Sequence, residues 1–136
     1  MIFLRNISVL ALAMGGALST AGFAQDAQNG EDLYFQYCVG CHGMEARGDG
    51  NVAAVLKVKP ADLTGLSARN DGVYPTVLVA YRIDGRDPII AHGGTMPVYG
   101  EFLGEPLVAM KAPSGQPLLI GQEIADLIAY LETMQE

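Results

Sequence analysis

The pentapeptide Cys38-Val39-Gly40-Cys41-His42 constrains this chain more than any other stretch of its sequence. Two cysteines separated by two residues and followed directly by a histidine form the attachment signature of a c-type haem. Each thiol can add across a vinyl group of the porphyrin to give a thioether, and the spacing sets the two sulfurs about one helical turn apart. Neutral imidazole is a good iron ligand, so His42 is the predicted proximal ligand.

Three other kinds of site also use closely spaced cysteines. A dithiol redox motif usually follows a strand in an alternating α/β pattern, and no such pattern flanks Cys38. A structural zinc site needs four ligands, but the chain has no further cysteine and only one other histidine, His92. A disulfide between residues so close in sequence would close a very small loop and add little stability. Haem attachment is therefore the favoured interpretation.

The N-terminal segment has the pattern of a secretory signal peptide. Arg5 supplies the positive start, and an apolar run follows at 7–18. Small residues then precede a predicted cleavage site after Ala24, with Ala21 as the second choice. The apolar run is short for a membrane span and is interrupted by two glycines, so no stable span is expected after cleavage.

Cleavage would leave a single domain at 25–136 after a leader at 1–24. The whole chain has 8 Lys and Arg residues against 15 Asp and Glu residues, and loss of Arg5 leaves 7 against 15, a net charge of −8. Such an acidic domain repels nucleic-acid phosphates, so no nucleic-acid partner is expected. A redox partner protein with a basic docking surface is the better electrostatic match. Because c-type haem is attached outside the cytoplasm, we predict a bacterial periplasmic location.

Helical patterns recur along the domain. A first helix is predicted at 30–39 with Asn29 as its N-cap, and a short one at 51–58. A further helix is predicted at 75–85, where a proline starts it and a glycine stops it. The last helix is predicted at 121–134, and its one-sided apolar stripe consists of Ile124, Leu127, Ile128 and Leu131. No strong alternating strand pattern is present.

Met96 is the predicted second axial ligand of the iron. Glycines precede it, which lets the backbone approach a flat cofactor closely, and Pro97 stiffens the segment that carries its thioether. A soft thioether favours ferrous iron and raises the reduction potential. Two alternatives stay open, because the same loop could present His92 and another loop could present Met110.

These features resemble those of the class I c-type cytochromes, and the resemblance covers nearly all of 25–136. Its most specific parts are the haem motif and the Met-Pro-Val-Tyr-Gly sequence at 96–100, while 125–131 is similar to the family's last helix. In the family a small residue and an aromatic on the first helix cross the last helix. The matching residues here are Gly30 and Tyr34 on one side and Leu127 and Tyr130 on the other.

The resemblance implies an all-α cytochrome c fold, in which three to five helices wrap around one covalently bound haem c. In this family a backbone carbonyl near a proline holds the proximal imidazole. Pro60 is the candidate here, and Leu63 would pack on the ring. Mitochondrial members are strongly basic whereas this chain is acidic, so their docking partners are not transferred to it.

The predicted function is one-electron transfer by a carrier that is not itself an enzyme. No Ser/His/Asp or paired-carboxylate arrangement indicates catalysis. The first alternative is a dedicated haem subunit of a dehydrogenase or oxidase complex, which would need an apolar patch around the Met96 segment. Val98, Tyr99, Phe102, Leu103 and Val108 are the residues that could form it. The second alternative, a haem enzyme or gas sensor, would require that Met96 not bind the iron.

Overall fold

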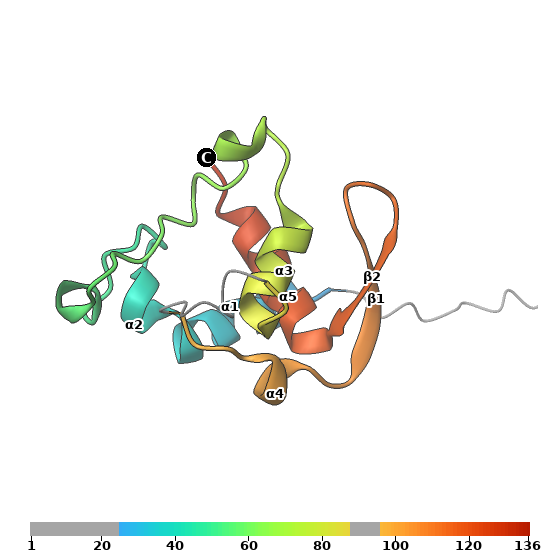
Figure 1. The fold of residues 1–136 in the computed structure, drawn as a ribbon, viewed down its shortest axis with the longest axis horizontal. Coiled ribbons are helices and arrows are strands. Elements are labelled where there is room, and N and C mark those ends of the chain that lie inside the picture. Colours follow the sequence, from blue (N-terminus) through green and yellow to red (C-terminus); the bar gives the residue numbers. More distant parts are fainter. Residues whose placement is uncertain (1–24, 88–95) are drawn as a thin grey trace, which may run out of the picture.

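The computed structural model describes residues 25–87 and 96–136, and the predicted signal peptide and His92 lie outside this part (Figure 1). Helices dominate the described part, and none of them is long and apolar enough to cross a bilayer. The α-helices are α1 (Ala27–Tyr37), α2 (Val39–His42), α3 (Thr76–Asp84), α4 (Gly100–Leu103) and α5 (Gln122–Thr133). Two 3-10 turns, η1 (Ala53–Val55) and η2 (Ala68–Asn70), and two strands, β1 (Leu107–Lys111) and β2 (Pro117–Gly121), complete the described elements.

The two terminal helices, α1 and α5, cross in the core of the molecule (Figure 1). A Cβ atom placed on Gly30 would lie 2.0 Å from the carbonyl oxygen of Asp126 and 2.9 Å from Cβ of Tyr130. Only glycine therefore allows the two backbones to approach this closely. One turn further along α1, the fully buried ring of Tyr34 packs on Tyr130 with centroids 5.5 Å apart. The predicted helix crossing is confirmed.

The buried carboxylate of Asp126 determines where α1 begins. Its Oδ1 accepts a hydrogen bond from the Asp26 backbone N–H at 2.9 Å, and its Oδ2 accepts one from Asn29 Nδ2 at 2.8 Å. Asp26 in turn accepts from the N–H groups of Gln28 and Asn29 and is the N-cap. The prediction of Asn29 as N-cap was wrong, because its side chain is used to bind α5 and Asp26 caps a helix that starts at Ala27.

The predictions for α3 and α5 are confirmed to within a residue at each end. Helix α3 follows Pro75 and ends at Gly85, whose φ of +92° suits glycine. The apolar stripe of α5 is buried throughout. The helix expected at 51–58 is reduced to the single turn η1, where Val55 is 80% exposed. No apolar face of that segment is buried, so packing does not stabilise a longer helix.

A small β-hairpin follows α4, which the expected all-α fold did not include. Strands β1 and β2 pair antiparallel, with Leu107 opposite Gly121 at one end and Lys111 opposite Pro117 at the other. One face of the hairpin packs on the core and carries Val108, Met110, Leu118 and Ile120. The other face is also largely apolar, with Leu107 and Leu119 exposed, so the sequence lacks the apolar–polar alternation that normally indicates a half-buried strand.

Substitution of Gly30 tests the importance of the helix crossing. We expect Gly30→Ala to lower the free energy of unfolding of the haem-loaded protein by about 1–3 kcal/mol or more, because the added methyl forces α1 and α5 apart. Denaturant unfolding measures this. The matched control is Gly40→Ala, whose Cβ would meet its nearest neighbour at an ordinary 3.7 Å. Equal stability of the two variants would contradict the close packing described here.

Candidate functional site

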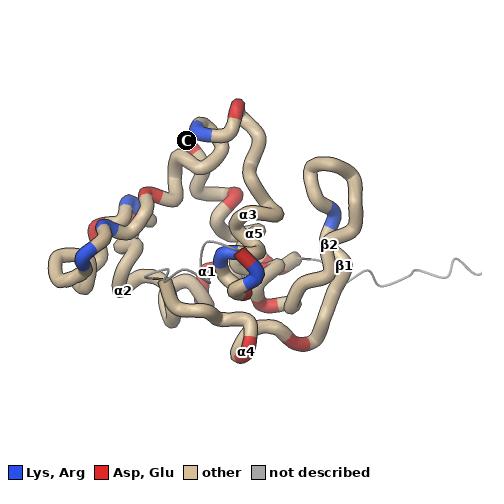
Figure 2. Tube along the Cα trace, in the orientation of Figure 1, with Lys and Arg blue, Asp and Glu red and all other residues tan. Residues whose placement is uncertain are grey.

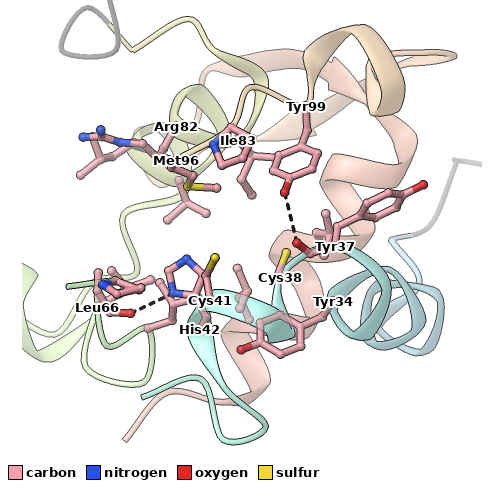
Figure 3. A pocket seen from close by; sticks show the side chains of 18 of the residues that line it. Tyr34, Tyr37, Cys38, Cys41, His42, Leu66, Arg82, Ile83, Met96 and Tyr99 are labelled. Atoms are coloured by element: carbon pink, nitrogen blue, oxygen red, sulfur yellow. Dashed lines mark hydrogen bonds between the residues drawn. The ribbon is translucent and has the colours of Figure 1, made fainter. Parts of the chain in front are cut away.

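A cavity of about 390 Å³ lies between α2 and α3 and is shown in Figure 3. The end of α1, the loop at 56–66, the segment at 96–99 and one face of α5 complete its walls. The lining is mainly aliphatic and aromatic side chains. The few polar or ionisable groups among them therefore stand out as candidates for chemistry.

Both cysteines of the haem motif line this cavity. Cys38 follows the last residue of α1, and its backbone N–H still donates to the Tyr34 carbonyl at 2.8 Å. Cys41 lies within the short helix α2, which puts both half-buried thiols on the same side of the cavity. Burial is the main cause, and the nearby Cys41 thiol the second, of a rise in the pKa of the Cys38 thiol to about 11. This thiol is therefore protonated at neutral pH.

His42 ends α2 and projects its ring into the same cavity (Figure 3). Its Nδ1 lies 2.9 Å from the carbonyl oxygen of Ala61. Because a carbonyl can only accept, Nδ1 carries the proton and the lone pair of the neutral ring resides on Nε2. Burial lowers the pKa of His42 below its usual value, although the bond to Ala61 opposes the shift. The structure thus holds a neutral imidazole, the form that can bind a metal.

The loop that holds this imidazole packs tightly against the turn after the haem motif. A Cβ atom on Gly48, whose φ is +74°, would lie 2.2 Å from the carbonyl oxygen of Pro60. The Leu63 N–H donates to the Ala46 carbonyl at 2.7 Å. The carbonyl that accepts from His42 belongs to the residue after Pro60, and both Pro60 and Leu63 line the cavity.

Met96 lies on the wall opposite His42. Figure 3 shows its thioether sulfur directed into the cavity from above, with the imidazole below it. Met110, the alternative that the sequence left open, is buried in the core on β1 and does not line this cavity. The other alternative, His92, lies outside the described residues.

Among the described residues that line the cavity, two carry basic side chains. Lys59 and Arg82 are the cations, and no aspartate or glutamate lines the described walls. Arg82 also forms an ion pair with the buried Asp87 at 2.9 Å. Neither cation was expected from the sequence, since a lysine in a loop and an arginine on a helix carry no motif that marks them as part of a site.

The comparisons with known proteins agree with this geometry. The family model for Cytochrome c matches residues 27–135. The chain belongs to the cytochrome c family. It is 33% identical over 112 residues to cytochrome c-554(547) of Halothiobacillus neapolitanus, a match that covers 82% of this chain and 100% of that protein. No solved structure gives a significant match. Cytochromes of this family carry electrons by covalently bound haem c, and this cytochrome is accordingly an electron carrier rather than an enzyme.

The residues around the cavity fit a haem c. Two thiols lie on one side of the cavity. The imidazole of His42 lies below, and its Nδ1 is bonded to the Ala61 carbonyl, so the lone pair of the ring is on Nε2. The walls are apolar, as a porphyrin requires, and the only two charged side chains in the described lining, Lys59 and Arg82, are of the sign that suits the two carboxylates of a haem. The small β-hairpin is an addition to the helical cytochrome c fold and contributes no cavity residue.

Folding of this cytochrome should depend on its haem. Without the haem, the apolar walls of this cavity of about 390 Å³ would be exposed to water, so the domain would lose much of the apolar burial that stabilises it. We expect the double variant Cys38→Ala, Cys41→Ala to yield little folded protein. Amide dispersion in an NMR spectrum measures this, with the haem-loaded wild type as reference. A well-dispersed spectrum from the double variant would contradict the expectation.

Proposed function

We propose that this cytochrome is a periplasmic one-electron carrier whose haem is held by thioethers to Cys38 and Cys41 and ligated at the iron by His42 and Met96. The observation that carries the proposal is the placement of the imidazole and the thioether on opposite walls of one apolar cavity, with both thiols on one side of it (Figure 3). A bound haem c supplies the ferric–ferrous couple.

The two thiols attach the cofactor by simple addition. With haem bound, each Sγ–H would add across one vinyl group, so that a carbon–sulfur bond would form, the hydrogen would go to the neighbouring carbon and no group would leave. Cys38 and Cys41 suit this role because Cys38 lies between α1 and α2, Cys41 lies within α2, and both thiols line the same cavity. The resulting bonds also tie the end of α1 to the cofactor.

His42 and Met96, the two proposed iron ligands, are suited to that role by different properties. His42 is oriented by its hydrogen bond to the Ala61 carbonyl, and such a bond fixes the tautomer and increases the donor strength of the other nitrogen. Met96 supplies a soft, neutral sulfur, which favours ferrous iron and a raised reduction potential. If His42 and Met96 both hold the iron, no position for a substrate would remain at the metal, which would suit a carrier.

Ligation by Met96 predicts a specific optical signature. The oxidised wild type should show the weak near-infrared sulfur-to-iron band, and Met96→Ala should abolish it because the sulfur donor is lost. Met44→Ala is the matched control, since Met44 is 67% exposed and should leave the band unchanged. Persistence of the band in Met96→Ala would show that another residue is the ligand.

The alternative, a dedicated haem subunit, would need a substantial apolar patch beside the Met96 segment. Of the five residues expected to form it, Leu103 and Val108 are buried, which corrects that expectation. Val98 is 41% exposed and Phe102 is 75% exposed. This smaller surface suits the transient docking of a carrier, in which weak contacts permit fast release.

Docking is proposed to occur at α4, which directly follows the Met96 segment. Phe102 supplies an exposed apolar contact there, and Glu101 supplies one of the acidic charges that occur along much of the chain (Figure 2). A basic partner would be attracted by such charges, and added salt would screen the attraction.

The expected result of replacing these residues is slower electron transfer from the native donor. Phe102→Ala removes short-range contact, and Glu101→Lys reverses a charge, so both should lower the bimolecular rate constant in stopped-flow measurements at low salt, and the effect of Glu101→Lys should fade as salt is added. Leu119→Ala is the control, because Leu119 is 59% exposed on the hairpin and lines no part of the cavity. Unchanged rates for both α4 variants, with no salt dependence, would place docking on another face.

A further inference from the structure

Tyr99 connects the segment that carries Met96 to the end of α1. Its hydroxyl donates a hydrogen bond to the backbone carbonyl of Tyr37 at 3.1 Å (Figure 3). The two rings also meet edge to face, with centroids 5.7 Å apart and planes at 61°. Both rings line the cavity. Because Tyr37 directly precedes Cys38, this contact joins the Met96 segment to the haem motif itself.

The backbone around Tyr99 is held equally firmly on its other side, by the C-terminal end of α3. The Tyr99 N–H donates to the Ile83 carbonyl at 2.8 Å. A Cβ atom on Gly100 would lie 2.3 Å from the Asp84 carbonyl oxygen, and one on Gly85 would lie 2.3 Å from Cγ1 of Val98. These close approaches leave the segment little freedom to slide along α3. Tyr99 therefore lies where the segment is held both to α3 and to α1.

We propose that Tyr99 is a positioning residue that keeps the thioether of Met96 opposite His42, and that its hydrogen bond to the Tyr37 carbonyl closes the cavity on the Met96 side. The inference rests on the proposed ligation by Met96. The imidazole of His42 is oriented separately, by its own hydrogen bond to the Ala61 carbonyl. The two axial groups are thus held by separate elements, and the support of one can be weakened without disturbing the other.

The chain offers a closely matched pair of variants. Tyr99→Phe removes a phenolic hydroxyl and with it the hydrogen bond, but keeps the aromatic pair. Tyr37→Phe removes the same group from the other ring, yet the acceptor in this pair is the Tyr37 backbone carbonyl, so the bond between the segments survives. The hydroxyl of Tyr37 accepts only from the exposed neighbour Gln36 among its described hydrogen bonds.

The test is displacement of the methionine by added imidazole in the oxidised, haem-loaded protein, followed by loss of the near-infrared sulfur-to-iron band. The hydrogen bond of Tyr99 would stabilise the conformation in which Met96 faces His42. Added imidazole must displace Met96 from that conformation, so its apparent affinity falls by the factor that the hydrogen bond contributes to the equilibrium. Tyr99→Phe should therefore lower the imidazole concentration at half displacement about two- to tenfold, the ratio that corresponds to one net hydrogen bond. Tyr99→Leu, which also removes the ring contact, should lower it further. Tyr37→Phe should match the wild type.

The outcomes separate this inference from the function on which it rests. Absence of the band from the wild type would overturn the ligation by Met96. A normal band in the wild type, with the same half-displacement concentration in Tyr99→Phe, would overturn the positioning role alone. An equal effect in Tyr37→Phe would also overturn it, since the bond between segments would then not be the cause. Far-UV circular dichroism of each variant checks that its helices are intact.

Discussion

The close crossing of α1 and α5 at Gly30 is the constraint on which the rest of the structure depends. It brings the backbone of α1 against the Asp126 carbonyl and lets Tyr34 pack on Tyr130. The position of α1 then determines where Cys38 emerges at its C-terminal end, while Leu127 of α5 forms part of the cavity wall. The same contact that builds the core therefore places Cys38, the proposed attachment point of the haem, relative to the cavity wall on which the haem would pack.

Much of the cavity is built from irregular chain, and specific hydrogen bonds replace regular secondary structure there. The loop that orients His42 is tied to the C-terminal residues, since Gln135 Nε2 donates to the Leu63 carbonyl at 2.8 Å and the Glu136 N–H donates to the Thr64 carbonyl at 3.0 Å. On the other side, Tyr99 ties the Met96 segment to α1 and α3. The carbonyl that orients His42 thus lies on a loop that the C-terminal residues restrain, and Met96 lies on a segment that α1 and α3 restrain. Such restraint would suit a metal whose two proposed ligands must stay in place while its charge changes.

The parts of the fold that could be predicted from sequence were those with strong local signals. The helical periodicity of α5 and the proline and glycine that bound α3 are properties of short stretches, and both predictions are confirmed. The hairpin was missed because its exposed face is apolar like its buried one, so no alternation appears. The N-cap was misplaced because the choice between Asp26 and Asn29 depends on Asp126, which lies about a hundred residues away in sequence.

For the site, the sequence alone determined the chemistry: two thiols and an imidazole at a spacing that suits haem attachment, and a methionine after glycines that suits the second ligand. Those roles follow from residue type and local spacing and remain predictions for the experiments above. Tertiary structure decided what surrounds them. The carbonyl of Ala61 that orients His42, the two cations in the cavity lining and the bond from Tyr99 to Tyr37 all join residues that are distant in sequence or lack a motif. Such contacts depend on the packing of α1, α3 and α5, which no local pattern specifies.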